Sequence, residues 1–396
     1  MRIAVVSWTS RRVGGIEDYV SMLIPALHGA RSALAFWHEV DTPHDRARIE
    51  VPPGTMDICA ADVGLEGSIR QLCDWKPDVL YVQGVQSPEV EAKLLEIAPA
   101  VCFVHDYSAT CISGTKMFAR PHAVACDRRF GPACLAHYFP SGCGGNNPLT
   151  MWRLFATRSN RLRHFDRYAA IVTSSEHMRK EMEHHGLHAE VLPFPIAADA
   201  SNGATRWGGG WQLLFAGRME NLKGGDYLIE AAPEVARATH RPLRVILAGE
   251  GRERAHWEAL AERVQRTTAH LTIEFTGWLS QEQLSGLMKG CDLLVVPSLW
   301  PEPFGSVGPF AAQYGLPAAA FASGGIPDWL GDGVTGHLAP ADPPTPQGLA
   351  RAIVQCLEDP AHYAALRNGA RQMATRFTME RHLPALMARL SALAPQ

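Results

Sequence analysis

The chain is predicted to be an α/β protein made of two doubly wound, parallel-sheet domains. Short apolar runs alternate with segments of helical spacing, which is typical of βαβ units. The pattern occurs twice, and a small, polar, glycine-rich stretch, Ala197–Gly210, separates the two sets as a linker would. At 396 residues, with 46% hydrophobic and 19% charged residues, the chain suffices for about two globular domains. We place an amino-terminal domain at 1–197 plus 378–396 and a carboxyl-terminal domain at 211–377.

The elements follow from apolar runs and their spacing. Strands are expected in the first half at Ile3–Ser7, Leu34–Trp37, Val79–Gln83, Ala100–His105, Ile171–Ser174 and Val191–Pro193. In the second half they are expected at Trp211–Ala216, Arg244–Ala248, Thr272–Thr276, Leu293–Pro297, Pro317–Phe321 and Gly336–Ala339. Helical spacing is found at Tyr227–Ala238, Glu253–Gln265, Gln281–Lys289, Val307–Tyr314 and Met379–Leu393. Two such domains are expected to hold a ligand in a central cleft, between the carboxyl ends of their strands.

Composition excludes several classes of protein. A formal charge of -3 gives no reason to expect a nucleic-acid partner, and no run approaches the ~18 apolar residues that span a bilayer. The apolar start, Met1–Trp8, is too short for a secretory signal and is followed by Ser10-Arg11-Arg12, so we expect a cytoplasmic protein. No G-x-G-x-x-G follows a predicted strand, which argues against a nicotinamide enzyme.

The most informative segment is a glycine-rich loop that follows the apolar run Leu293–Val296. It reads Trp300-Pro301-Glu302-Pro303-Phe304-Gly305-Ser306-Val307-Gly308, and a second glycine cluster follows at Gly324–Asp328. A glycine loop between a strand and a helix exposes backbone N–H groups at the positive end of the helix dipole, where phosphates bind. Glu302 suits the hydroxyl groups of a sugar. The segment therefore predicts a phosphorylated sugar as ligand.

Two further turns carry candidate binding groups. Gly217–Gly224 follows a predicted strand, and its Arg218 and Lys223 are suited to clamp a diphosphate; the alternative is a capping turn with two solvated cations. Gly14 and Gly15 follow the first strand and would let the backbone approach a ligand, or form an ordinary flexible turn.

Together these motifs resemble the retaining, nucleotide-sugar-dependent glycosyltransferases of the GT-B type, family 4 (glycosyl transferases group 1). The resemblance covers essentially the whole chain, and its specificity lies in the order and spacing of the motifs. The motifs are Gly14-Gly15, His105-Asp106, Thr173-Ser174-Ser175-Glu176, Gly217-Arg218, Lys223-Gly224, Ala248-Gly249-Glu250-Gly251, Phe275-Thr276-Gly277, Glu302-Pro303-Phe304-Gly305 and Gly324-Gly325-Ile326-Pro327. It implies two Rossmann-like domains that face a central cleft.

The resemblance implies a role for each matching position. Arg218 and Lys223 would neutralise the leaving pyrophosphate, and Glu302 would meet the hydroxyls of the transferred sugar. His105 would face the donor sugar and the acceptor, or be a histidine of the core. The donor contacts implied are Gly14, Gly15, Gly217, Gly249, Phe304, Gly305, Ser306 and Val307.

The resemblance also implies the reaction. A UDP- or GDP-sugar would be the donor, no metal cofactor would be required, and a donor phosphate oxygen would take the acceptor proton during front-face attack. Electrostatic stabilisation of the leaving diphosphate would then be the main catalytic term.

Phe310 departs from the family pattern. The family has a second glutamate at this position, which accepts hydrogen bonds from the ribose diol, and phenylalanine cannot do so. Another group holds the ribose, or stacking and phosphate contacts hold the nucleotide, or the donor is unusual or the activity lost. Since Arg218, Lys223 and Glu302 are all present, we favour a working enzyme.

An insert at about 106–150 is the second departure. It contains Cys111, Cys126, Cys134 and Cys143 in turn-rich text without clear secondary structure. Structural zinc, disulfides and packed free thiols are the alternatives; the C-x2-C spacing typical of zinc sites is missing, and nine cysteines cannot all be paired within the chain. The insert is expected to shape acceptor choice.

The segment Met151–Tyr168 predicts a basic amphipathic helix. Such a helix can dock on anionic lipid, as a peripheral contact at the inner face of a membrane, or pack one face and solvate the other.

Two other function classes remain as alternatives. A nucleotide-sugar epimerase on the same fold would need carboxylates placed for elimination across the sugar ring, and only Glu302 is well placed. A catalytically impaired sugar-nucleotide-binding protein is favoured only by Phe310. The sequence leaves the base, the donor sugar and the oligomeric state open, and the acceptor is a glycan, a lipid-linked sugar or a small molecule.

Overall fold

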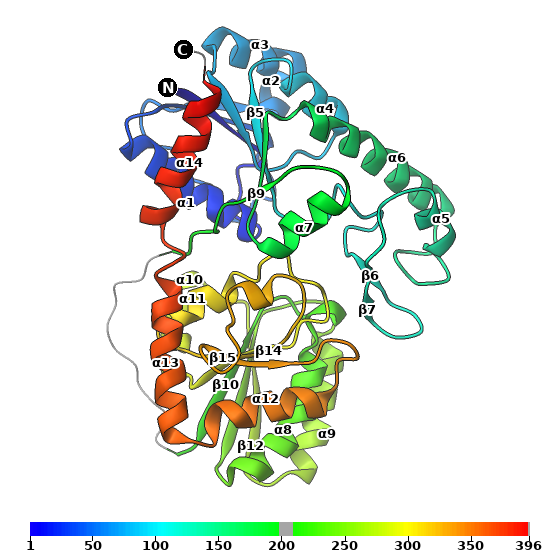
Figure 1. Ribbon diagram of the computed structural model, residues 1–396, viewed down its shortest axis with the longest axis vertical. Coiled ribbons are helices and arrows are strands. Elements are labelled where there is room, and N and C mark those ends of the chain that lie inside the picture. Colours follow the sequence, from blue (N-terminus) through cyan, green and yellow to red (C-terminus); the bar gives the residue numbers. More distant parts are fainter. Residues whose placement is uncertain (198–208, 395–396) are drawn as a thin grey trace. The chain divides into compact units, whose positions relative to one another are not determined.

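The computed structural model describes residues 1–197 and 209–394, and the chain divides into two compact units (Figure 1). The amino unit comprises Met1–Pro121, Cys126–Ala197 and Thr378–Gln396, and the carboxyl unit comprises His122–Ala125 and Ala198–Phe377. Most of the predicted linker, Ala197–Gly210, lies outside the described residues, namely positions 198–208.

The amino unit is built on a seven-stranded parallel sheet in the order β3-β2-β1-β4-β5-β8-β9. Its strands are β1 (Arg2–Thr9), β2 (Ala33–Val40), β3 (Met56–Cys59), β4 (Val79–Val82), β5 (Ala100–Val104), β8 (Ala170–Thr173) and β9 (Glu190–Val191). Its helices are α1 (Gly15–Gly29), α2 (Ala60–Val63), α3 (Leu65–Trp75), α4 (Pro88–Leu94), α5 (Ala133–His137), α6 (Pro148–His164), α7 (Glu176–His184) and α14 (Met379–Leu393). The central strands β4 and β5 are buried along their whole length, as expected where helices cover both faces of a sheet.

The carboxyl unit has a six-stranded parallel sheet in the order β12-β11-β10-β13-β14-β15. Its strands are β10 (Trp211–Ala216), β11 (Leu243–Ala248), β12 (Leu271–Gly277), β13 (Leu293–Val296), β14 (Ala318–Phe321) and β15 (Gly336–Ala339). Its helices are α8 (Gly225–Thr239), α9 (Arg254–Thr267), α10 (Gln281–Gly290), α11 (Val307–Ala312), α12 (Pro346–Leu357) and α13 (Pro360–Ala374). In both units a strand order that turns back on itself makes the sheet doubly wound.

The prediction of two doubly wound parallel sheets is confirmed, and every predicted strand is present with small shifts at its ends. The sequence analysis missed β3, because Met56–Cys59 is a short edge strand whose apolar run is broken by Asp57. The predicted helix Val307–Tyr314 is shorter than expected and ends at Ala312.

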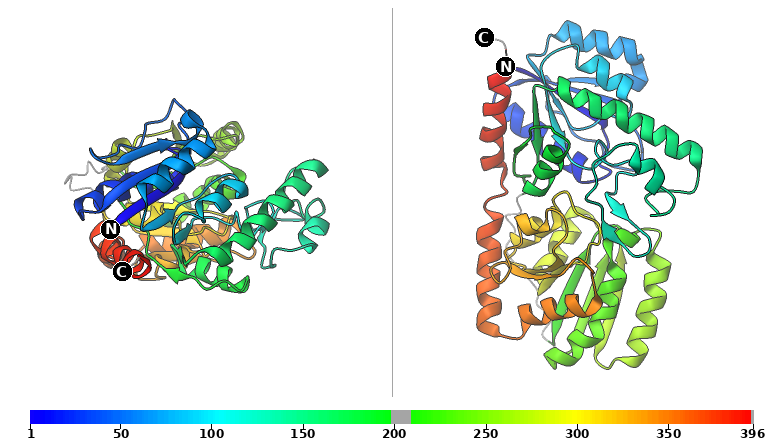
Figure 2. Two further views of the ribbon diagram at one scale, coloured as in Figure 1. Left: turned by 90° about the horizontal axis from the view of Figure 1, so that it is seen from above. Right: turned by 45° about the vertical axis from the view of Figure 1, so that its right-hand side comes forward.

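The helix α14 lies beside α1, although about 350 residues separate them in the chain (Figures 1 and 2). His382 fixes this contact from the buried face of α14, where it is only 2% exposed. Its Nε2 is 2.8 Å from the hydroxyl of Tyr19 on α1, and its Nδ1 is 2.9 Å from the carbonyl oxygen of Pro193. Burial lowers the pKa of His382 to about 4, so the ring is neutral in the folded chain at neutral pH.

This histidine makes folding stability depend on pH. Between pH 4 and the unfolded pKa near 6.5, the unfolded chain binds a proton at His382 that the folded chain does not, so stability falls as the pH drops through this window. We expect His382→Gln to flatten the dependence by roughly 2–3 kcal/mol between pH 7 and pH 4.5, as measured by urea unfolding. The exposed His188→Gln is the control and should unfold like the wild type at both pH values. Equal pH dependence in His382→Gln and wild type would contradict this account.

Among residues 1–197 and 209–394, no helix combines the length and the apolar character needed to span a bilayer.

Candidate functional site

The candidate residues of the carboxyl unit gather where its strand order reverses. β10 lies between β11 and β13, so the loops after β10 and β13 leave the sheet in opposite directions and open a crevice. Arg218 and Lys223 follow β10, and Glu302 follows β13. Ligands of doubly wound sheets bind at such a point, outside the carboxyl ends of the strands.

Lys223 and Glu302 form an ion pair in this crevice. Lys223 Nζ lies 2.6 Å from Glu302 Oε1, and Ser298 donates a hydrogen bond of 2.7 Å to the same oxygen. The ammonium group also lies 4.9 Å from the centre of the Trp300 ring, within the range of a cation–π contact. Glu302 is 6% exposed, so its charge is held by these two neighbours instead of water.

Arg218 differs from Lys223 in its surroundings. It is exposed, and its guanidinium makes no hydrogen bond or ion pair with any described residue. The helix α8 begins directly after Lys223, with Gly224 as its N-cap and no side chain capping its first N–H groups. Two cations and an uncapped helix N-terminus therefore adjoin one loop, an arrangement suited to an anion.

Two glycines allow backbone segments to approach closely beside these charges. Gly249 has φ +141°, and a Cβ there would lie 1.9 Å from the carbonyl oxygen of Gly217. Gly324 has φ +62°, and a Cβ there would lie 2.4 Å from the backbone of Glu302. Side chains at either position would push the loops apart, so glycine is required by both conformation and space.

Two aromatic side chains, Trp329 and Phe377, hold the loop from Phe304 to Val307 in place. The indole of Trp329 donates a 2.7 Å hydrogen bond to the carbonyl oxygen of Phe304, whose ring lies 5.3 Å from that of Phe377. Gly305 has φ +80°, and Ser306 is the N-cap of α11 without a side-chain cap. The first N–H groups of α11 thus lack a side-chain partner at the end of this loop.

Phe310 lies on α11 and offers no acceptor for a ribose diol. Its ring packs edge-on against Tyr314, with ring centres 5.8 Å apart. The hydroxyl of Tyr314 donates to Ser285 at 2.9 Å. Phe310 therefore has an apolar packing role on this helix.

In the amino unit, Gly14 and Gly15 follow β1, which lies beside β4 at the reversal of strand order, and His105 follows β5, the next strand of the sheet. Gly14 is the extended N-cap of α1, and Gly15 has open space where a Cβ would stand. His105 directly follows β5; its Nε2 is 2.9 Å from Gln83 Oε1. Burial lowers the pKa of His105 to about 4, so its ring is neutral near pH 7 and serves as a hydrogen-bonding group.

The insert has more secondary structure than predicted. It forms a two-stranded sheet of β6 (Met117–Phe118) and β7 (Val124–Ala125), followed by α5. Lys116 joins the insert to α7 through a buried ion pair with Glu181, 2.6 Å long. These two strands and this helix were not predicted, because each is only a few residues long and turn residues surround it.

All four candidate metal ligands of the insert, Cys111, Cys126, Cys134 and Cys143, are free thiols. Within the described part of the chain no group of three or more His, Cys, Asp or Glu is arranged to hold a metal ion. Cys134 and Cys143 pack against an apolar cluster around Ile112, Tyr138 and Met151, and Cys111 accepts a hydrogen bond from the N–H of Lys116 at 3.2 Å. The structure contains no disulfide among these four cysteines. Burial, and then Cys111, Cys126 and Cys134, raise the pKa of the Cys143 thiol, so the four lie near one another; the choice between structural zinc and packed free thiols stays a prediction.

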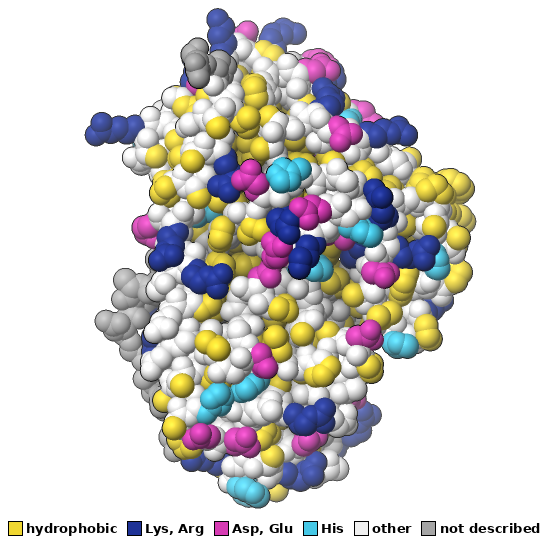
Figure 3. Space-filling model, viewed as in Figure 1, with side chains coloured by type: hydrophobic (Ala, Val, Ile, Leu, Met, Phe, Trp, Pro, Cys, Tyr) yellow, Lys and Arg dark blue, Asp and Glu magenta, His cyan; other side chains and the backbone are white. Residues whose placement is uncertain are grey.

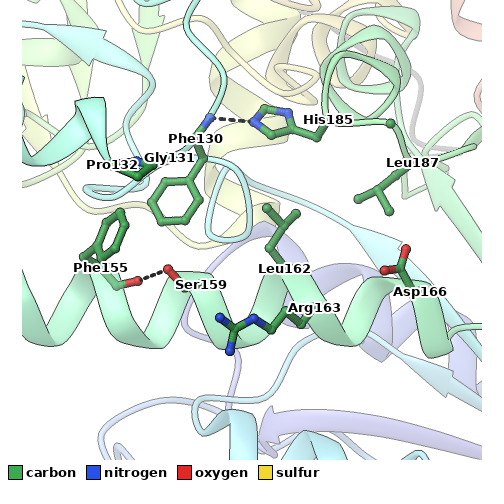
Figure 4. A pocket seen from close by; sticks show the side chains of 11 residues that line it. Phe130, Gly131, Pro132, Phe155, Ser159, Leu162, Arg163, Asp166, His185 and Leu187 are labelled. Atoms are coloured by element: carbon green, nitrogen blue, oxygen red, sulfur yellow. Dashed lines mark hydrogen bonds between the residues drawn. The ribbon is translucent and has the colours of Figure 1, made fainter.

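A cavity of about 340 Å³ lies between the insert, α6 and the turn after α7 (Figure 4). Phe130, Phe155 and Leu162 give it an apolar wall. His185 accepts a 2.8 Å hydrogen bond from the N–H of Phe130 at its edge. The cavity contains none of the predicted site residues.

Several residues that build the site were not predicted. Ser298 and Trp300 orient Glu302 and Lys223, and Trp329 supports the Phe304 loop. Ser298 and Trp300 are near the glycine-rich loop in sequence and could have been proposed from that proximity. Trp329 has no such signal, because its role depends on a contact across 25 residues.

Comparison of the sequence and the fold with those of known proteins identifies similar proteins. Residues 201–373 match the family model of the Glycosyl transferases group 1, which supports this family for the carboxyl unit. A glycogen synthase of Mycobacterium tuberculosis is 36% identical over 168 residues, 41% of this chain and 38% of that protein. A 2-deoxystreptamine glucosyltransferase of Streptomyces kanamyceticus is 34% identical over 170 residues, 43% of this chain and 42% of that protein. The matched part spans only about two fifths of these relatives.

Solved structures resemble the chain along its whole length. The structure of Anabaena Alr3699/HepE in complex with UDP has a TM-score of 0.69 at 18% identity and covers 99% of this chain and 100% of that chain. WaaG, a glycosyltransferase involved in lipopolysaccharide biosynthesis, has a TM-score of 0.67 at 16% identity with full coverage of both chains, 100% each. At these identities the likeness establishes the fold, two Rossmann-like domains of the GT-B type.

Proposed function

We propose that the chain is a glycosyltransferase that moves a sugar from a nucleotide diphosphate sugar to an acceptor hydroxyl, with retention of the anomeric configuration. The observation that carries the proposal is the Lys223–Glu302 pair at the crevice between β10 and β13. A cation for a diphosphate and a carboxylate for sugar hydroxyls then lie side by side, as an activated sugar requires. Similarity of the carboxyl unit to group 1 glycosyl transferases supports the same reading.

The residues suggest how the reaction is catalysed. As the sugar leaves, negative charge develops on the diphosphate, and Lys223, Arg218 and the N–H groups at the start of α8 stabilise it. Glu302 accepts hydrogen bonds from the sugar, while its pairing with Lys223 keeps both side chains in position. In this proposal a donor phosphate oxygen takes the acceptor proton, so no side-chain base is needed and His105 orients substrate as a neutral ring.

The donor is proposed to be a UDP- or GDP-sugar. The Anabaena structure was determined in complex with UDP, and that protein shares the fold of this chain. Gly217 and Gly249 would leave room for the nucleotide, and the backbone of Phe304–Val307 would hold the sugar and phosphate.

A peripheral membrane contact is part of the proposal for the basic helix. Leu149 and Trp152, at the beginning of α6, are 79% and 56% exposed, and hydrophobic side chains gather at that edge of the molecule (Figure 3). Two arginines of the helix, Arg153 and Arg163, are exposed, and the helix has no acidic residue, which suits an anionic lipid surface. Co-sedimentation with anionic vesicles, compared with neutral ones, tests this contact.

Incubation with a panel of UDP- and GDP-sugars, with and without sugar acceptors, tests the reaction. We expect nucleotide diphosphate release that depends on acceptor, and a product whose anomeric signal in NMR matches that of the donor. Isomerised donor sugar without release would favour the epimerase. Donor binding without any turnover across the panel would favour a binding protein, the alternative that Phe310 raises.

A further inference from the structure

The amino unit contains a second cavity, of about 380 Å³, that is separate from the cavity of Figure 4. It lies at the carboxyl ends of β1, β4 and β5, where Trp8, Gln83 and His105 line it, and α6 closes one side with Arg158 and Arg161. Its volume falls within the range of about 300–1,000 Å³ that is usual for small-molecule sites. Of the residues that line it, His105 and Asp106 belong to a motif noted in the sequence, and a role in the site was predicted only for His105.

Arg158 has no partner in this cavity. Its guanidinium makes no hydrogen bond or ion pair with any described residue, and its Nε is closed off from solvent. Burial and the neighbouring Arg161 lower the pKa of Arg158, while the carboxylate of Asp106 raises it, and an arginine stays charged at neutral pH. Removing a charged group from water is unfavourable unless it is hydrogen-bonded, so an anionic ligand that accepts hydrogen bonds from Arg158 would be favoured here.

Gln83 supplies a second donor without an acceptor. Its Oε1 faces His105 Nε2 at 2.9 Å, which leaves the NH₂ group directed elsewhere. This Nε2 is buried and has no hydrogen-bond partner among the described residues. The cavity therefore contains two buried donors from different elements, β4's end and α6, that both require an acceptor.

The other charged groups of the cavity already have partners. Arg161 lies 3.5 Å from Glu91 and donates to the carbonyl oxygen of Gln86 at 3.1 Å, while Tyr168 donates to Glu91 at 2.6 Å. Asp106 accepts the N–H of Ser108 at 2.7 Å and forms no ion pair with Arg158. Arg158 is thus the charged side chain of the cavity that makes no hydrogen bond or ion pair with a described residue.

We propose that this cavity binds the acceptor of the reaction and that the acceptor carries a phosphate group held by Arg158 and Gln83. That the bound molecule is an acceptor depends on the proposed transfer reaction, whereas the phosphate site depends only on the residues of the cavity. Asp106 and His105 would face the hydroxyl groups of the same molecule, because a carboxylate and a neutral imidazole suit hydroxyls and not phosphate.

Calorimetric titration of the full chain with glucose 6-phosphate, and with glucose as the neutral control, tests the proposal. We expect the wild type to bind the phosphorylated sugar more tightly, and Arg158→Met to lose at least tenfold in that affinity. Arg163→Met is the matched control, since Arg163 lies on the same helix, is exposed and does not line the cavity. Thermal unfolding of each variant shows that the loss is not a loss of fold.

A second arm identifies the source of the phosphate. Binding to phosphatidylcholine vesicles with and without phosphatidylinositol is compared for wild type and Arg158→Met. Loss in the soluble arm assigns a free sugar phosphate, and loss in the vesicle arm alone assigns a lipid headgroup. Equal binding by wild type and Arg158→Met in both arms, or no binding of either probe by the wild type, overturns the proposal.

Titration with UDP separates this inference from the proposed function. Binding of the phosphorylated sugar through Arg158 without binding of UDP would support the phosphate site and contradict the proposed transfer reaction. Binding of UDP, together with binding of the phosphorylated sugar that does not change in Arg158→Met, would support the transfer reaction and contradict the phosphate site.

Discussion

Lys223→Met is expected to lower kcat by roughly 10²–10³-fold, the loss seen when one preorganised electrostatic group is removed from an active site. The methionine keeps most of the side-chain volume but removes the charge that would stabilise the departing diphosphate. KM for the donor should rise less than kcat falls, because the charge on the diphosphate is larger in the transition state than in the bound donor. Steady-state kinetics with the best donor from the panel measures both.

The same substitution leaves Glu302 without its cation, so stability must be separated from catalysis. Glu302 is almost fully buried, and we expect Lys223→Met to lower the free energy of unfolding by about 3–5 kcal/mol. The double variant Lys223→Met/Glu302→Met removes both charges and should regain stability without regaining activity. Arg266→Ala, an exposed cation on α9, is the control and should be near wild type in both measurements. Near-normal kcat in Lys223→Met would refute the proposed role of the lysine.

Gly249→Ala is expected to destabilise the carboxyl unit by at least about 3 kcal/mol, through backbone strain and a direct clash. At φ +141° an alanine is strained in itself, and its Cβ would lie 1.9 Å from the carbonyl oxygen of Gly217. Since this carbonyl belongs to the turn that leads to Arg218, the loops that carry the site must separate. We therefore expect UDP binding to weaken together with the midpoint of urea unfolding.

A glycine elsewhere in the same unit provides the matched control. Gly286 lies inside α10, and a Cβ there would meet no atom within 4 Å. Gly286→Ala should therefore leave stability unchanged or raise it by about 0.5–1 kcal/mol, because alanine favours a helix over glycine. Equal destabilisation by both substitutions would mean that the clash at Gly249 is absorbed and that the close approach of the two turns is not required.

Much of the fold could be predicted because its signals are local. Apolar runs such as Val79–Gln83 and Leu293–Pro297 are buried on both faces of a parallel sheet, so they stand out as continuous stretches. The short edge strand β3 and the pieces of the insert could not be recognised, since each is only two to five residues long and too short for a periodic pattern. The carboxyl-unit candidates were predicted as a group because glycine loops after strands are visible in sequence.

By itself, the sequence determined the two doubly wound sheets and the residue types at the ends of their strands, because apolar periodicity and glycine turns act over a few residues. Only the tertiary structure decided which of these residues meet. It pairs Lys223 with Glu302 across 79 residues and places Trp329 against the Phe304 loop. It also leaves Arg158 Nε and Gln83 Nε2 buried without a hydrogen bond to a described residue. Such contacts follow from the order of the strands in the sheet and from packing between distant segments, which no local pattern of residues encodes.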